Sequence, residues 1–150
     1  MAKNWTLQDL VKKGLMQSEH LPKSLIVTPE SITIDIRAVP KPRMTQSDKW
    51  KQRPIVTNYR QYKDDLRSLL PQGFFLPDSF KIIFAFEITE SWSKDKKLSM
   101  LSMPHQQKPD LDNCVKGITD ALNKKDESIW HCDAKKIWAL KNYIQIIIAK

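Results

Sequence analysis

The sequence lacks several features that define large classes of protein. Its two cysteines form no C-x-x-C pair, so a zinc ribbon is not expected. No stretch approaches the roughly 18 apolar residues of a membrane span, and residues 1–5 do not begin the long apolar run of a signal peptide. Internal repeats and low-complexity tracts are also missing. We therefore expect a cytoplasmic protein whose thiols are reduced.

Acidic residues are the minority among the charged ones. The chain has 25 Lys and Arg against 17 Asp and Glu, a formal net charge of +8. An excess of this kind favours a polyanionic partner such as nucleic acid. With 150 residues, of which 41% are hydrophobic, the chain is long enough for one domain with its own core.

The first residues are predicted to extend that domain. Thr6 can cap a helix that runs to Met16, and Asp9 completes a pattern that resembles a capping box. A polar linker that contains a proline follows this helix. We predict an N-terminal helical extension in residues 1–23 and a single domain in residues 24–150.

Within the domain, the apolar pattern predicts both strands and helices. Alternating apolar residues predict strands at residues 24–27, 31–39, 80–88 and 138–149. Apolar residues three and four apart predict helices at residues 58–70, with Asn58 as the N-cap, and 112–123. Irregular loops are predicted at residues 41–57 and 90–108. This mixture indicates an α/β (α+β) domain.

The most informative segment is the run Pro109-Asp110-Leu111-Asp112-Asn113. It places two carboxylates two residues apart at the start of a predicted helix, where the helix dipole favours negative charge. Lys116 and Asp120 follow at four-residue intervals, so they share a helix face with Asp112. The apolar residues lie on the other side, which leaves this face available for chemistry. A further acid, Asp133, lies on the approach to the last predicted strand.

A cluster of carboxylates in a basic chain suits a hard divalent cation. Asp110, Asp112 and Asp133 offer oxygen ligands for one or two Mg²⁺ ions, with Mn²⁺ as a substitute. Such an ion polarises a phosphoryl oxygen, and Lys116 can meet charge that develops on a scissile phosphate. Structural roles are the alternative: Asp112 as a helix cap, Asp110 as a turn residue, and Lys116 with Asp120 as a surface ion pair.

Positive charge is concentrated in the two predicted loops. Their basic residues include Lys41, Arg43, Lys49, Lys51, Arg53, Lys94, Lys96 and Lys97. Such side chains neutralise phosphates largely regardless of sequence, so we predict that both loops bind DNA. Solvated loops without a ligand are the alternative. Trp50 and Trp92 lie among these charges, and each either stacks on an unpaired base or makes a core or dimer contact.

Together these residues resemble one protein family. The run 109–113, followed by Lys116, by Asp120-Ala121-Leu122 and by Trp130-His131-Cys132-Asp133-Ala134, is similar to the pattern of the RusA family of Holliday junction resolvases. Two further segments, Pro40-Lys41-Pro42-Arg43 and Ser91-Trp92-Ser93-Lys94, also resemble sequences of that family. The likeness covers roughly residues 31–148, and its helical part is the most specific.

The resemblance implies a fold and an activity. Members of the family are small homodimeric, Mg²⁺-dependent endonucleases, often carried by phages and prophages, with a mixed β-sheet flanked by helices. They resolve four-way DNA junctions by paired symmetric nicks. The resemblance implies that Asp110, Asp112 and Asp133 bind the metal, that Lys116 is important for catalysis, and that Asp120 is an accessory residue. A homodimer would match the two-fold symmetry of the junction.

One position departs from the family pattern. Where the family often has two adjacent acids, this chain has Cys132-Asp133, and Asp133 corresponds to the acid on which the family relies more. His131 is either an extra ligand or base, or a solvated histidine. Two rival functions use the same residues: a nuclease for flaps, forks or ordinary duplex, and a junction-binding module whose acids no longer support catalysis.

Overall fold

The computed structural model describes residues 25–27, 31–43, 45, 53–123 and 127–148. The helix predicted at residues 6–16 lies outside these ranges, as do Lys49, Trp50 and Lys51. Five strands and three helices form in the described ranges. None of these helices is long and apolar enough to cross a membrane.

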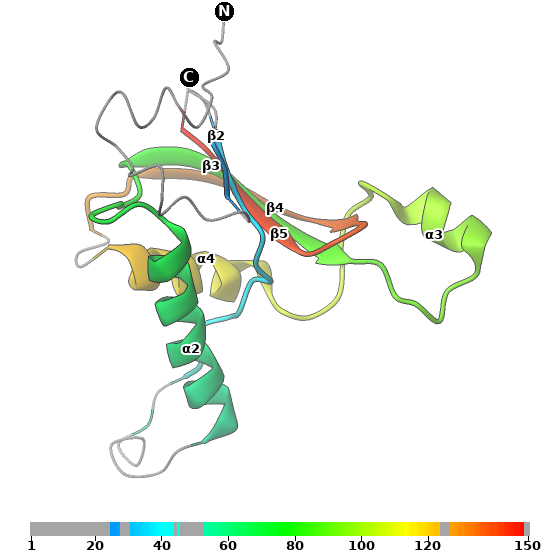
Figure 1. Cartoon of the computed structure of the whole chain (residues 1–150), viewed down its shortest axis with the longest axis horizontal. Coiled ribbons are helices and arrows are strands. Elements are labelled where there is room, and N and C mark those ends of the chain that lie inside the picture. The colour runs from blue at the N-terminus through cyan, green and yellow to red at the C-terminus, as the bar shows by residue number, and fades with distance from the viewer. Residues whose placement is uncertain (1–24, 28–30, 44, 46–52, 124–126, 149–150) are drawn as a thin grey trace, which may run out of the picture.

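A mixed β-sheet forms the centre of the domain (Figure 1). Its five strands are β1 (Leu25–Val27), β2 (Ser31–Ile34), β3 (Ser79–Glu87), β4 (His131–Ala139) and β5 (Tyr143–Ile147). They lie in the order β1-β2-β5-β3-β4. The pair β3 and β4 is parallel, and the other neighbouring pairs are antiparallel. The predicted α+β class with a mixed sheet is confirmed.

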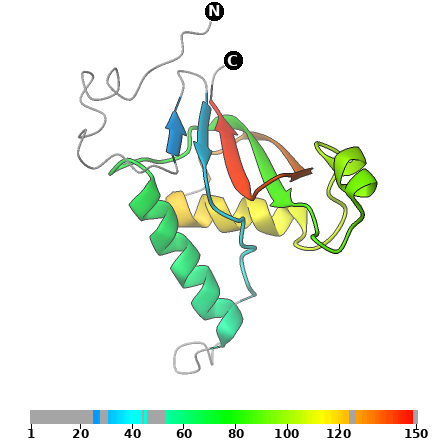
Figure 2. The same cartoon turned by 45° about the vertical axis from the view of Figure 1, so that its right-hand side comes forward.

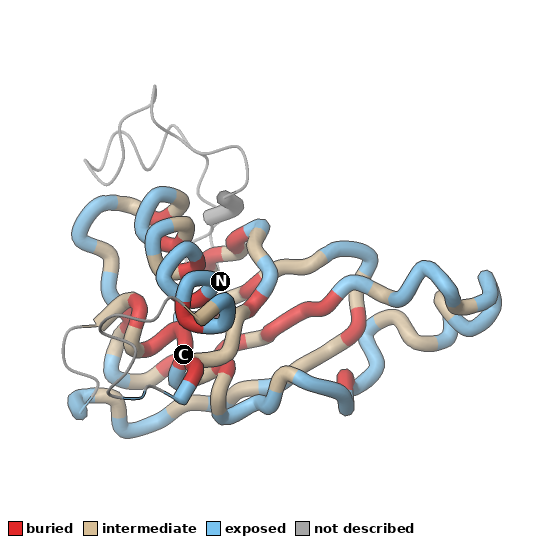
Figure 3. Tube along the Cα trace, turned by 90° about the horizontal axis from the view of Figure 1, so that it is seen from below, coloured by how far each residue is buried: buried red, intermediate tan, exposed pale blue. Residues whose placement is uncertain are grey.

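Two helices cover one face of this sheet. They are α2 (Pro54–Leu69) and α4 (Leu111–Leu122), and they cross below the strands in Figures 1 and 2. The core lies between them and the sheet, with Tyr59 and Leu66 from α2, Ile118 from α4, and Ile82 and Phe84 from β3. Helix α3 (Lys94–Met100) stands away from this core and has no buried residue. Figure 3 shows its exposed positions at the far end of the molecule.

Two predicted elements are present with different bounds. Strand β2 ends at Ile34 instead of residue 39, because the Ile36 N–H donates to the Ile34 carbonyl and the chain turns out of the sheet. Helix α2 begins at Pro54, four residues before the start expected at Asn58. Proline suits the first turn of a helix because its missing N–H has no partner to lose there.

Two other predictions are wrong. The loop predicted at residues 90–108 contains α3, whose N-cap Ser93 accepts a hydrogen bond from the Lys96 N–H at 3.2 Å. The single strand predicted at residues 138–149 is the end of β4 followed by β5. Leu140 lies in the turn between them with 72% of its surface exposed, so its apolar side chain concealed the break in the pattern.

The predicted second helix is confirmed as α4, and Val115, Ile118 and Leu122 pack against the core. Cys114, Gly117, Ile118 and Ala121 are buried there. Leu111, the first residue of the helix, is 36% exposed. Small side chains therefore line much of the face on which α4 packs, and they permit a close approach.

The chain that leaves β2 passes directly against α4 at Gly117. A Cβ atom at Gly117 would lie 2.5 Å from the Val39 carbonyl oxygen and 3.2 Å from the Lys41 nitrogen. The Lys41 N–H donates to the Asn113 carbonyl at 3.1 Å, and the Tyr59 hydroxyl donates to the Gly117 carbonyl at 2.8 Å. These contacts fix α4 against both α2 and the segment that follows β2.

We predict that Gly117→Ala lowers the free energy of unfolding by about 1–3 kcal/mol, because the new methyl group overlaps backbone atoms that cannot move easily. Denaturant titration measures this change. Thr57→Ala, at an exposed position of α2, is the control and should change stability by no more than about 0.5 kcal/mol. An equal or higher stability of Gly117→Ala would contradict the close approach.

Candidate active site at the start of α4

Asp110 and Asp112 lie together at the start of α4. Asp110 is the N-cap residue, and its carbonyl accepts the Cys114 N–H at 3.0 Å. Its carboxylate makes no capping hydrogen bond, and Asp112 lies in the first turn. Both residues are exposed, and within the described ranges neither carboxylate has a hydrogen-bond or ion-pair partner. Both are therefore available to bind a ligand.

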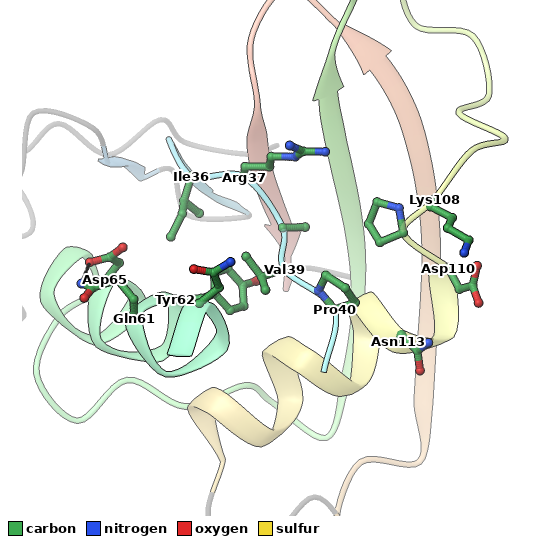
Figure 4. Close-up of a pocket in the computed structure, with 13 residues that line it drawn as sticks. Ile36, Arg37, Val39, Pro40, Gln61, Tyr62, Asp65, Lys108, Asp110 and Asn113 are labelled. Atoms are coloured by element: carbon green, nitrogen blue, oxygen red, sulfur yellow. Dashed lines mark hydrogen bonds between the residues drawn. The ribbon is translucent and has the colours of Figure 1, made fainter. Parts of the chain in front are cut away.

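A cleft of about 730 Å³ opens beside Asp110 (Figure 4). Its lining combines the segment 36–40, one side of α2, and the residues that lead into α4. Figure 4 shows Lys108, Asp110 and Asn113 at one end of the cleft and Gln61 at the other. The side chains of the segment 36–40 lie between these ends. A cleft of this size, lined by the free carboxylate of Asp110, has room for part of a substrate.

Lys116 and Asp120 share the helix face as predicted, but they do not form an ion pair. Lys116 is exposed, and its ammonium has no partner in the part of the chain that the structure describes. Asp120 binds the ammonium of Lys41 instead. The pKa of Tyr59 is raised to about 12, by burial first and then by the charge of Asp120. Asp120 thus lies inside the packing contact between α4 and the segment after β2.

Asp133 lies apart from the other two acids. It is the third residue of edge strand β4 and is paired with Lys81 of β3. Its neighbours Cys132 and Ala134 pack against the core, so the alternation of the strand directs Asp133 to the face opposite α4. In the described residues, no three His, Cys, Asp or Glu side chains gather closely enough to hold a metal. The structure brings Asp110 and Asp112 together, and Asp133 does not join them.

The residues beside Asp133 have distinct environments. His131 is exposed, and its Nδ1 lies 2.9 Å from the Ser79 hydroxyl oxygen. Cys132 is partly buried, and its thiol pKa is raised by burial and by the charge of Asp133. A thiol with a raised pKa stays neutral at pH 7, so Cys132 does not replace the missing carboxylate as an anionic ligand.

Lys136 and His105 lie close to the site, and the sequence reasoning missed both. The Lys136 ammonium donates to the Gln107 carbonyl at 2.5 Å and to the Pro109 carbonyl at 2.7 Å. The buried ring of His105 stacks against Phe86 at 4.4 Å between ring centroids. Strand alternation could have indicated Lys136, because it places this residue on the helix-facing side of β4, where lysine is unusual.

Charged groups at the start of α4 and on β4 affect the pKa of the buried Cys114 thiol. Its pKa is raised to about 11, first by burial. The charge of Lys136 lowers this pKa, and the carboxylates of Asp110 and Asp112 raise it. Asp110, Asp112 and Lys136 therefore lie close enough to the Cys114 thiol to affect its pKa.

The donors at the start of α4 fit a hard divalent cation. Asp110 and Asp112 offer carboxylate oxygens that no other described group occupies. Mg²⁺ in enzymes that act on phosphates commonly uses one or two protein carboxylates, and waters and substrate oxygens complete its coordination. A site with two protein carboxylates is therefore within the usual coordination of Mg²⁺.

The predicted DNA-binding residues differ in exposure and in whether their side chains already have partners inside the protein. Arg43 and Lys94 are exposed, whereas Lys41 is bound to Asp120. The Lys96 ammonium lies 4.5 Å from the centre of the Trp92 ring, and that ring meets Trp138 edge-on at 4.8 Å. For Trp92 the core-contact alternative therefore holds. Arg53 donates to the Arg43 carbonyl at 2.9 Å.

Comparison with protein families agrees with the site. A family model described as Endodeoxyribonuclease RusA matches residues 34–149, which include Asp110, Asp112, Asp120 and Asp133. Comparison with curated proteins and with solved structures gave no match. The match covers most of the chain and confirms the resemblance read from the helical motif. This chain belongs to the RusA family of endodeoxyribonucleases, hydrolases that cut DNA at Holliday junctions and generally require a divalent metal.

Proposed function

We propose that this protein resolves four-way DNA junctions by Mg²⁺-dependent, paired symmetric nicks. The observation that supports this most directly is the pair of exposed, unpartnered carboxylates, Asp110 and Asp112, of which Asp110 lines an open cleft. A net charge of +8 supplies attraction for the phosphate backbone. Family membership connects the chain as a whole with DNA cleavage.

Asp110 and Asp112 are the proposed metal ligands. Both lie at the N-terminal end of α4, where the helix dipole favours their negative charge. When bound, Mg²⁺ supplies polarisation of the scissile phosphate and lowers the pKa of a water molecule. Mn²⁺, which also accepts oxygen ligands, is expected to substitute for it. Asp110 lines the cleft, so a metal that it holds would lie at the edge of the cleft.

Asp133 is the proposed third ligand, on the basis of the family pattern. It is exposed on an edge strand, and in the described ranges its carboxylate has no partner. To reach the other acids, its side chain must pass around the outer edge of β4, since the strand alternation directs it to the opposite face. A separate test of this residue is therefore needed.

Lys116 is proposed to contact the scissile phosphate. It lies one turn after Asp112 on the same exposed face of α4, and its ammonium is unpaired in the described residues. A cation held near the reacting phosphate stabilises charge that develops in the transition state. Asp120 is assigned an accessory role, because it anchors Lys41 against α4.

DNA binding is proposed to involve the basic residues on both sides of the site. Arg43 and Arg53 precede α2, and Lys94, Lys96 and Lys97 belong to α3. Lys49 and Lys51, outside the described residues, belong to the same proposal.

The protein is proposed to act as a homodimer, because two equivalent sites match a two-fold symmetric junction. The proposed location is the cytoplasm of a bacterial or phage-infected cell. Residues 1–23 are proposed as an extension, since the family match begins at residue 34.

Cleavage of a mobile four-way junction, with and without Mg²⁺ and with products mapped on all four strands, tests the proposed function. Symmetric nicks on two opposite strands are expected, and only in the presence of the metal. Flap and linear duplex substrates at equal salt are the comparison. Stronger cleavage of flaps or duplex would favour a different nuclease, and binding without any cleavage would favour a junction-binding module.

We predict that Asp110→Asn and Asp112→Asn each lower the cleavage rate by at least about 100-fold, because each removes a charged oxygen ligand. Junction affinity, measured by gel shift without metal, should remain within about threefold, since binding rests on the basic residues. Wild-type cleavage by either variant would remove that residue from the site.

Asp133→Asn tests whether the third ligand implied by the family pattern binds metal in this chain. If Asp133 reaches the metal, we expect a loss of rate as large as for Asp112→Asn and weaker Mg²⁺ binding by calorimetry. A rate within about threefold of wild type would show that two carboxylates suffice.

We predict that Lys116→Ala lowers kcat by about 100-fold with a small change in KM, because the lost contact acts mainly in the transition state. Steady-state cleavage of the junction measures both parameters. Lys141→Ala removes the same charge from the turn between β4 and β5 and should leave kcat unchanged. Equal kcat for Lys116→Ala and wild type would exclude a catalytic role.

A further inference from the structure

The segment before α4 runs along the outer edge of β4. The Ser102 N–H donates to the Trp138 carbonyl at 2.8 Å, and the Trp138 N–H donates to the Met103 carbonyl at 3.0 Å. Pro104 forms an antiparallel bridge with Ile137. The edge strand therefore determines the path of the chain that leads to the acids, at least as far as residue 105.

At Lys136 this attachment involves both the backbone and the side chain. The Lys136 carbonyl accepts the His105 N–H at 3.0 Å. Its ammonium then reaches further along the same segment and donates to the carbonyls of Gln107, at 2.5 Å, and Pro109, at 2.7 Å. The Pro109 carbonyl belongs to the peptide unit that leads directly into Asp110. One side chain thus holds both of these carbonyls just before the first acid.

This position does not suit Lys136 for binding DNA. The residue is partly buried, and two of the three donors of its ammonium are used by the protein. It lies on the helix-facing side of β4, and its ammonium binds the carbonyl of the residue before Asp110. The nearby ring of His105 does not supply this positive charge, because burial and the charge of Lys136 both lower its pKa.

We propose that Lys136 is a positioning residue that holds the peptide before Asp110 so that the Asp110 carboxylate is presented beside Asp112 for metal binding. This inference rests on the proposed role of these two acids. Groups that orient a metal ligand without touching the metal commonly change metal affinity by about 10–100-fold when removed. Lys136 acts through backbone carbonyls, so its length and its donors should both matter.

Three variants test the proposal. Lys136→Met removes the charge and the donors but keeps an unbranched side chain, whereas Lys136→Arg keeps donors on a different head group. Lys135→Met is the matched control, because Lys135 is the neighbouring residue, is exposed, and points to the opposite face of the strand. The measurements are Mg²⁺ and Mn²⁺ binding by calorimetry without DNA, the Mg²⁺ concentration for half-maximal junction cleavage, and junction affinity without metal.

We expect Lys136→Met to bind both metals about 10–100-fold more weakly and to need a correspondingly higher Mg²⁺ concentration for cleavage. Lys136→Arg should recover part of this affinity. Lys135→Met should bind metal within about twofold of wild type. Junction affinity without metal should be nearly the same in all of them, because the phosphate contacts come from other residues.

Wild-type metal affinity in Lys136→Met would overturn the proposal. An equal loss of metal affinity in Lys135→Met would also overturn it, because the effect would then follow from lost charge alone. If Lys136→Met does not fold, Lys136→Gln, which keeps one donor group, replaces it with the same expected direction. A wild-type protein that neither binds metal nor cleaves the junction would refute the proposed function itself, which is a distinguishable result.

Discussion

The position of α4 depends on a contact between backbone and backbone. At Gly117 there is no side chain to separate the helix from the segment after β2, and the Val39 carbonyl occupies the space that a methyl group would need. Lys41 binds α4 through its backbone and through Asp120, and Tyr59 reaches the same turn from α2. Because the acids belong to the first residues of α4, their location relative to the sheet follows from this contact.

Charged side chains that have partners inside the protein differ in their proposed roles from those that have none. Carboxylates that hold the fold have partners, as Asp120 has Lys41, whereas Asp110 and Asp112 have none in the described ranges. Lys116 is likewise unpaired there, while Lys136 uses its ammonium on two carbonyls. Burial keeps the Cys114 thiol neutral in spite of nearby charges. Three ionic groups without partners in the described ranges, Asp110, Asp112 and Lys116, therefore belong to the N-cap and the first half of α4.

The sequence predicted most of the fold and one part of the site. Strong periodicity located β3 and α4, and helical spacing placed Asp112, Lys116 and Asp120 on one face. The side of the sheet on which Asp133 lies depends on strand pairing, which local spacing does not encode. No role was predicted for Lys136, because an isolated lysine resembles a surface residue until strand alternation places it beside the helix. The Lys41–Asp120 pair joins residues 79 positions apart, beyond any local pattern.

The order of strands has a consequence for biosynthesis. β5 lies in the middle of the sheet, between β2 and β3, yet it follows both of them in the chain. While β5 is still inside the ribosome, the two halves of the sheet have no shared partner, although the acidic residues have already been made. The sheet that supports the cleft can therefore close only after this strand emerges. A chain that ends before β5 would carry every proposed metal ligand, but its β1–β2 and β3–β4 pairs would not be joined into one sheet.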